Sequence, residues 1–233
     1  MKTIVTKLGN GGAFSEVSSA FLIEGEKTIL FDCGHGIFSK VKDEDIDYIF
    51  ISHTHLDHIS DLERLIYFRY FVRELKTTIL SGSKVIEELE RIFKNKFNSM
   101  YVNGENKPIQ MVEFKTIKEV HLPLPMKEIE VNHGPFNCYG LYLYHDDILI
   151  SGDTKASYNI FEVIKNHIQY GNIKVYHDFS SGLSHNNIHC CKDDFNAIYF
   201  ELLENERVEW EFYHTGEEIK VEDVIDTSIY DEK

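Results

Sequence analysis

The segment that most constrains this chain places three histidines and one aspartate within six residues: Ile51-Ser52-His53-Thr54-His55-Leu56-Asp57-His58. It begins at the end of the apolar, strand-like run 48–51. On extended backbone His53 and His55 project to the same side, because side chains alternate along a strand. Asp57 and His58 can point elsewhere once the chain turns. The segment therefore predicts a metal site. A solvated histidine-rich loop is disfavoured, because chance tracts rarely follow a strand with an aspartate interleaved.

Three later residues have the same placement after a strand-like run. His133 follows the run 128–132 and precedes Gly134-Pro135, a turn signal. Asp153 follows the apolar run 148–150, and His214 follows the run 210–213. Side chains at the carboxyl edge of a sheet can converge while the strand bodies stay buried. Imidazole and carboxylate suit borderline divalent ions such as zinc, and the lack of a cysteine pair argues against a closed structural zinc site.

In this order the motifs resemble those of the metallo-β-lactamase superfamily: His-x-His-x-Asp-His, a lone His, an Asp in a Gly-Asp-Thr context, and a final His. The resemblance runs from the glycine-rich turn 8–12 to His214. It implies an α/β fold, a four-layer αββα sandwich, in a single hydrolase domain over residues 1–233. It also implies two Zn²⁺ ions per chain, with Mn²⁺ as the alternative metal. The implied ligands are, for one ion, His53, His55 and His133; for the other, Asp57, His58 and His214; and, bridging both, Asp153.

A second pair resembles the acidic motif and histidine of the ribonuclease Z-like phosphodiesterases. Asp178 ends the strand-like run 173–178, and His189 precedes the helix-like run 192–203. The resemblance implies that Asp57, Asp178 and His189 are catalytic, with Asp178 holding a protonated His189 that donates to the leaving oxygen. Such a donor is worth about 10²- to 10⁴-fold in rate. His185 is the rival for this role, and a further alternative is that His189 only precedes the helix.

The charge of the chain limits its partners. It has 24 Lys and Arg against 39 Asp and Glu, a net charge of −15, whereas proteins that grip a nucleic-acid backbone show a basic footprint. No Gly/Pro-rich arm of the kind found in the transfer-RNA-processing relatives separates the motifs. The sequence therefore favours a small anionic nucleotide as substrate, attracted by the charge of the metals, over a large nucleic acid.

Within this branch the chain is most similar to small enzymes that hydrolyse cyclic mononucleotides, the phage anti-Pycsar phosphodiesterases among them. The similarity lies in the segments 57–65, 132–140 and 213–217. It implies a phosphodiesterase that suppresses cyclic-nucleotide immune signalling, and a homodimer in which one subunit helps to close the pocket of the other. Three alternatives remain: a ribonuclease Z-like RNA 3′-end endonuclease, another hydrolase of this fold such as a lactonase or thioesterase, and a non-enzymatic nucleotide binder.

Apolar periodicity predicts helices over residues 60–75, 83–97, 158–170 and 193–203. The first of these is rich in aromatic residues, and we expect most of that stripe to lie in the core or in a dimer contact. The four cysteines show no zinc-ribbon spacing, and there is no signal peptide or long apolar span. We therefore expect a cytoplasmic protein with free thiols and no membrane association, in the host cytoplasm if a phage encodes it.

Overall fold

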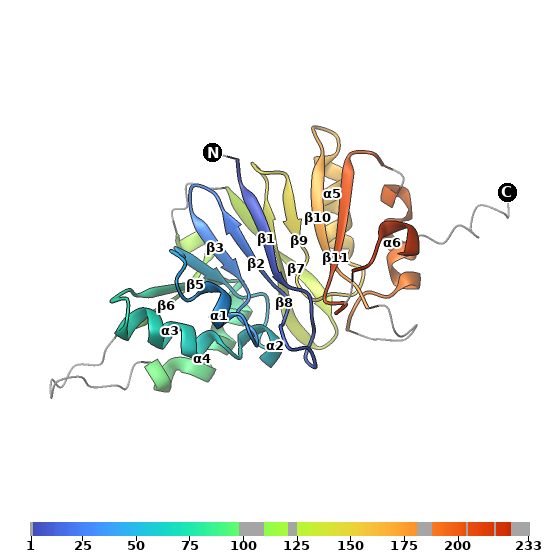
Figure 1. Ribbon diagram of the computed structural model, residues 1–233. Coiled ribbons are helices and arrows are strands. Elements are labelled where there is room, and N and C mark those ends of the chain that lie inside the picture. The colour runs from blue at the N-terminus through green and yellow to red at the C-terminus, as the bar shows by residue number, and fades with distance from the viewer. Residues whose placement is uncertain are drawn as a thin grey trace, which may run out of the picture. The chain divides into compact units, whose positions relative to one another are not determined.

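A computed structural model describes residues 2–97, 110–120, 125–180, 188–203, 205–216 and 218–224 (Figure 1). The chain divides into two compact units, Met1–Leu124 and Pro125–Lys233. The elements of the first unit are β1 Ile4–Gly9, β2 Ala20–Glu24, β3 Thr28–Phe31, α1 Phe38–Val41, β4 Tyr48–Phe50, α2 Leu56–Ile59, α3 Leu62–Phe71, β5 Thr77–Ser81, α4 Ser83–Phe97, β6 Val112–Thr116 and the 3₁₀ helix η1 Ile117–Glu119. Those of the second are β7 Met126–His133, β8 Phe136–Leu143, β9 Ile148–Ile150, α5 Tyr158–His167, β10 Ile173–Asp178, α6 Lys192–Leu203, β11 Val208–Tyr213 and α7 Val221–Val224.

The first unit is built on a six-stranded sheet in the order β1-β2-β3-β4-β5-β6. Strands β1 to β3 pair antiparallel, and β3 to β6 pair parallel. Helices α3 and α4 pack against β5, and the apolar strand bodies, such as Ile49 and Phe50, are fully buried. Because β3 and β4 run parallel, their carboxyl ends lie at one edge of the sheet. The loop that carries His53 leaves from that edge.

The second unit is built on a five-stranded sheet in the order β11-β10-β9-β8-β7. Strands β9, β10 and β11 are parallel, and β8 is antiparallel to both β7 and β9. Strand β7 therefore runs in the same direction as β9. As a result, β7, β9, β10 and β11 all have their carboxyl ends at one edge, where the sequence placed His133, Asp153, Asp178 and His214.

A single apolar core holds the second unit together. It joins strand residues such as Val175 and Trp210 to α5 and α6, which contribute Ile164, Phe195 and Tyr199. Burying one large apolar side chain is worth about 1.5–3 kcal/mol, so this core is the main support for the sheet edge that carries the polar residues. In Figure 1, α5 and α6 are the helices that accompany these strands, and α5 packs against β7.

The four predicted helices are present, with differences at their ends. Helix α4 has the predicted bounds, 83–97. Helix α3 ends at Phe71 rather than at residue 75, and Glu74 lies beyond it with φ 56°, a left-handed conformation that a helix cannot continue through. Helix α5 ends at His167 rather than at residue 170. Strands β5, β6 and β8 were not predicted from the sequence.

The aromatic helix α3 buries its aliphatic residues most completely. Leu65 and Ile66 are fully buried, whereas the side chain of Phe71 is 50% exposed. The prediction that this stripe lies in the core is therefore correct for the aliphatic residues, and only in part for the aromatic ones. A dimer contact through the exposed rings stays a prediction.

Two expectations about the environment of the chain can be compared with the structure. All four cysteines are free, as predicted, and the structure shows that all four are buried. Within the described ranges, no helix combines the length and the apolar character needed to cross a membrane. The prediction of one domain spanning residues 1–233 is not tested by the division into two compact units and stays a prediction.

Candidate metal centre and catalytic residues

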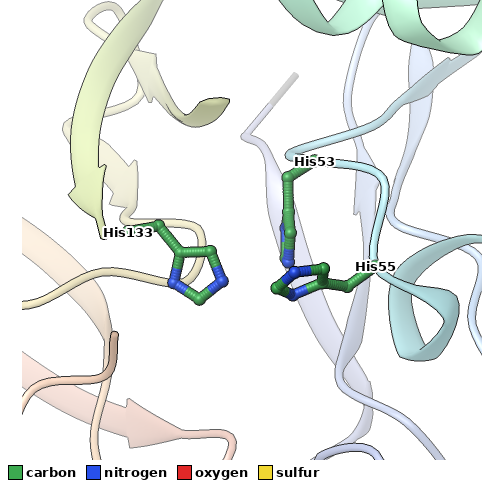
Figure 2. A group of neighbouring side chains, drawn as sticks. All are labelled: His53, His55 and His133. Carbon is green, nitrogen blue, oxygen red and sulfur yellow. The ribbon is translucent and has the colours of Figure 1, made fainter. Parts of the chain in front are cut away.

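The loop after β4 brings its histidines together within the first unit. The imidazole centroids of His53 and His55 are 4.6 Å apart, and those of His53 and His58 are 4.1 Å apart. Figure 2 shows His53 and His55 extending from this loop. His55 is extended, with φ −65° and ψ 148°, and directly precedes α2, which carries Asp57 and His58. The predicted change from extended chain to a turn within the motif is confirmed.

A buried carboxylate, Asp32, orients two of these rings. Its Oδ2 accepts hydrogen bonds from His58 Nδ1 at 2.7 Å and from Ser52 Oγ at 2.7 Å, while its Oδ1 accepts from the Ser52 backbone N at 2.7 Å. Because the Ser52 hydroxyl donates to Asp32, it accepts from His53 Nδ1, 3.0 Å away. Both imidazoles thus use Nδ1 in this network. Nε2 is then the nitrogen that would bind a metal, an arrangement typical of histidine ligands.

Asp32 is a residue of the candidate site that the sequence reasoning missed. It directly follows β3, so it carries the same signal, an acidic residue after an apolar strand, that identified Asp153. Its φ is 62°, a conformation that non-glycine residues rarely adopt, and its side chain is almost completely buried. Burial raises the pKa of Asp32 above its usual value, although the adjacent His58 acts in the opposite direction.

The loop after β3 also supports the ligand segment by close backbone packing. A Cβ added at Gly34 would lie 1.6 Å from the carbonyl oxygen of Asp57, so only glycine fits at this position. The Cys33 backbone N donates to the His58 carbonyl oxygen at 2.8 Å, and the Asp61 backbone N donates to the Cys33 carbonyl oxygen at 3.0 Å. The position of α2 is therefore set by contacts with a segment more than twenty residues away in sequence.

The second unit gathers four predicted residues at the carboxyl edge of its sheet. One ligand atom from each lies within 4.8 Å of the others, and the residues are Asp153, Asp178, His189 and His214. Asp153 is almost completely buried, and its Oδ2 is 3.5 Å from His214 Nε2. His214 follows β11 with φ 68°, and Gly152 before Asp153 has φ 67°. These left-handed residues turn the chain sharply at the strand ends, next to the polar cluster.

Asp178 and His189 form the predicted pair. His189 Nδ1 donates to Asp178 Oδ2 at 2.9 Å, and the Thr154 backbone N donates to the same oxygen at 2.8 Å. Asp178 is fully buried, so its carboxylate is held in a fixed position. His189 is also close to other site residues: its ring centroid is 4.7 Å from that of His214, and its Nδ1 is 3.7 Å from Asp153 Oδ2. This hydrogen bond fixes the orientation of the His189 ring, and the catalytic roles of both residues stay predictions.

His133, the last residue of β7, is oriented through its Nδ1 in the same way as His53 and His58. Its Nδ1 donates to the carbonyl oxygen of Ile188 at 2.8 Å, so Nε2 is the nitrogen that would bind a metal. Burial lowers the pKa of His133, which favours the neutral imidazole that a metal requires. Figure 2 shows His133 at the end of its strand.

His177, the neighbour of Asp178, has a structural role. Side chains alternate along β10, so His177 points into the core, where its Nε2 is 3.0 Å from the Tyr199 hydroxyl. Its Nδ1 donates to the Asp178 carbonyl oxygen at 2.7 Å, and burial lowers the pKa of His177 to about 4. This imidazole is neutral at physiological pH and lies away from the polar cluster. Of these two neighbours, only Asp178 faces the polar cluster.

Each unit offers donor atoms at separations that suit a metal ion. Two ligand atoms on one tetrahedral zinc ion, each about 2.0–2.1 Å from it, are about 3.3 Å apart. In the first unit His58 Nε2 is 3.6 Å from Asp57 Oδ2, and in the second His214 Nε2 is 3.5 Å from Asp153 Oδ2. These separations are close to that value. The assignment of each ligand to one of two ions stays a prediction, and His185 lies outside the described residues.

Comparison with known proteins agrees with this geometry. Residues 3–208 match the family described as Anti-Pycsar protein Apyc1, and His214 lies beyond the matched stretch. The Anti-Pycsar protein Apyc1 of Paenibacillus sp. (strain J14) is 29% identical over 161 residues, which are 63% of this chain and 64% of that protein. The aligned part is thus less than two thirds of the relative's length.

Solved structures show the fold. The metallo-β-lactamase fold protein YhfI from Bacillus subtilis is similar with a TM-score of 0.70 and 17% identity, over 96% of this chain and 91% of that one. Human tRNase Z, short form, is similar with a TM-score of 0.62 and 16% identity, over 91% of this chain and 92% of that one. The predicted α/β fold of the metallo-β-lactamase type is confirmed, and with the match over residues 3–208 the chain belongs to the Anti-Pycsar protein Apyc1 family.

Proposed function

We propose that this chain is a metal-dependent phosphoric diester hydrolase that opens 3′,5′-cyclic mononucleotides to linear nucleotides. The observation that carries the proposal is the Asp178–His189 pair, which lies at the same sheet edge as Asp153 and His214. A proton donor beside metal-binding side chains suits a reaction in which an alkoxide leaves phosphorus. The family description, Anti-Pycsar protein, supports a role in suppressing cyclic-nucleotide immune signalling.

The proposed cofactors are two zinc ions per chain, with manganese as the alternative. One ion would be held by His53, His55 and His133, and the other by Asp57, His58 and His214. Asp153 would contact both. When bound, two such ions supply a water nucleophile with a pKa lowered toward 7 and positive charge next to the phosphate oxygens.

The protein's own contribution to bond cleavage is the proton on His189. With Nδ1 donating to Asp178, the protonated ring presents its second N–H, at Nε2, as the donor to the leaving oxygen. The buried carboxylate stabilises the positive charge of the imidazolium and holds its orientation. Asp178 is in turn held by the Thr154 backbone N, which donates to its Oδ2, and the Asp178 backbone N donates to Ser151 Oγ at 2.9 Å.

A small substrate is favoured over a large RNA. The net charge of −15 opposes binding of an extended nucleic-acid backbone, whose affinity depends on many Lys and Arg contacts to phosphates. The likeness to human tRNase Z, at 16% identity, is a likeness of fold. A ribonuclease Z-like 3′-end endonuclease is therefore the runner-up. In a lactonase or thioesterase of the same fold, the Asp178–His189 pair would have no catalytic role.

A panel of cyclic mononucleotides and dinucleotides, with products identified by chromatography, tests the proposal. We expect turnover of 3′,5′-cyclic mononucleotides to linear nucleotides, and its loss when a chelator removes the metals. Processing of a precursor transfer RNA without turnover of any cyclic nucleotide would instead support the runner-up.

We further propose that the protein works in the cytoplasm as a homodimer, in which each subunit helps to close the pocket of the other. Two-fold dimers are the commonest closed assemblies, and the exposed aromatic residue Phe71 on α3 offers apolar surface for one. Light scattering should give twice the chain mass at working concentration. An active monomer would refute the dimer and leave the proposed chemistry intact.

A further inference from the structure

Phe136 stands beside a predicted metal ligand. It is the first residue of β8 and pairs across the hairpin with His133, the last residue of β7. Directly opposed residues of an antiparallel pair project from the same face of the sheet. Their rings accordingly lie 5.7 Å apart between centroids, inclined by 45°. The phenyl ring therefore extends the ligand-bearing edge of the second unit with an apolar surface.

The ring is exposed although the strand that carries it is largely buried. The side chain of Phe136 is 46% exposed, whereas Cys138, the next residue on the same face of β8, is fully buried in the core. Gly134 has φ 61°, and its backbone N donates to Asn132 Oδ1 at 3.3 Å, so the turn that positions Phe136 is well defined. Large aromatic side chains are usually buried, and one held at the edge of a polar site is typical of a ligand contact.

The neighbours of Phe136 indicate which part of a ligand it would contact. The centroid of His133 is 5.3 Å from that of His189, and His189 is 4.7 Å from His214. The four rings form a row in which Phe136 is the apolar end and the imidazoles are the polar part. An anionic group held at the site that these imidazoles line would leave the adjoining part of the same small molecule next to the phenyl ring. A phenyl ring offers no hydrogen-bond donor, so it selects an aromatic surface and tolerates different bases.

We propose that Phe136 forms the stacking surface for the nucleobase of the substrate. It is thus a specificity-determining residue that favours nucleotides over diesters without an aromatic base. The inference rests on the proposed function for the identity of the substrate, and it adds the residue that recognises the base.

Competition between two cyclic phosphodiesters tests this assignment. Adenosine 3′,5′-cyclic monophosphate and methyl riboside 3′,5′-cyclic phosphate share the reacting ring, but only the first has a base. Because stacking of a base on an aromatic residue is worth about 1–3 kcal/mol, Phe136→Ala should lower the ratio of their kcat/KM values by about 5- to 150-fold. Phe136→Leu should lower it similarly, since leucine keeps the bulk without the aromatic face, and Phe136→Tyr should restore it to within about threefold.

Tyr144 supplies the matched control. Its side chain is also 46% exposed, and it lies just beyond the other end of β8 in the same unit. Tyr144→Ala should keep the wild-type ratio. An unchanged ratio in Phe136→Ala, or rescue by leucine as complete as rescue by tyrosine, would overturn the assignment. Elemental analysis of each variant checks that the metals are retained.

A binding measurement keeps the inference separate from the proposed function. The chain has a single tryptophan, Trp210, which is buried, so Phe136→Trp introduces an exposed reporter. Adenosine 5′-monophosphate should quench its emission and ribose 5-phosphate should not, while Tyr144→Trp should respond to neither. If the wild type hydrolyses no cyclic nucleotide, the proposed function fails, and this quenching still decides whether Phe136 binds a base. Absence of quenching, or equal quenching in both tryptophan variants, would refute the inference.

Discussion

His189 has distances that suit two roles, so its function is the first question at the scale of single residues. Its Nδ1 is at hydrogen-bond distance, 2.9 Å, from Asp178, as a proton donor requires, and 3.7 Å from Asp153 Oδ2. One ligand atom from each of Asp153, Asp178, His189 and His214 also lies within 4.8 Å of the others, as in a metal site. Kinetics on two leaving groups distinguish a proton donor from a ligand.

If His189 is the proton donor, His189→Ala should keep both metals and lower kcat on cyclic nucleotides by about 10²- to 10⁴-fold. Asp178→Asn should lower kcat by a smaller factor. The defect should shrink on bis(p-nitrophenyl) phosphate, because nitrophenolate leaves without a proton. Steady-state kinetics with elemental analysis is the measurement. Equal losses on both substrates would make His189 a ligand or a structural residue, and equal retention on both would transfer the role to His185.

Asp32 is expected to control metal affinity without binding metal. Asp32→Asn keeps the size of the side chain and removes the charge that holds His58 Nδ1 and the Ser52 hydroxyl. Loss of such a partner typically weakens metal binding about 10- to 100-fold. Competition with a zinc chelator measures this.

Asp47→Asn is the control for Asp32→Asn, because Asp47 also accepts two hydrogen bonds, from Lys27 Nζ and the Thr28 backbone N, but in an exposed position. Its metal affinity should equal that of the wild type. The same affinity in the Asp32 variant would show that the histidines are oriented without the carboxylate.

At the scale of elements, the packing of the β3 loop against α2 depends on Gly34. A Cβ there would lie 1.6 Å from the Asp57 carbonyl oxygen, so Gly34→Ala must displace backbone. Overpacking of this kind costs about 1–3 kcal/mol, and we expect at least that loss in the free energy of unfolding. Urea unfolding of the metal-free protein measures the fold alone.

Gly171→Ala provides the comparison for Gly34→Ala. A Cβ at Gly171 would lie 3.7 Å from His167 Nε2, an ordinary contact, so this variant should unfold close to the wild-type midpoint. Equal midpoints for both alanine variants would mean that the loop after β3 moves freely and does not position α2.

At the scale of the whole molecule, the number of metal ions is the main expectation. The predicted ligands are more than one tetrahedral ion can take, so the purified protein should contain about two divalent ions per chain, most of them zinc. Elemental analysis against protein concentration tests this. One ion or none in fully active protein would contradict the dinuclear assignment.

The sequence alone determined features that depend on local spacing. The alternation of side chains placed His53 and His55 on one side, and their ring centroids are indeed 4.6 Å apart. Apolar periodicity located α4 with its bounds. Polar residues that directly follow apolar runs identified the carboxyl edge of the second sheet, because the carboxyl ends of strands that run in the same direction lie at one edge.

Tertiary structure decided the pairings between segments that are remote in the chain. Asp32 and His58 are 26 positions apart, and their contact depends on the close approach that Gly34 permits. Alternation shows that His177 and Asp178 face opposite sides of β10, but only the packing of the helices decides that His177 is the one in the core. The exposure of Phe136 likewise depends on where the core ends. Sequence spacing sets which side chains share a face, whereas register and close packing set which faces meet.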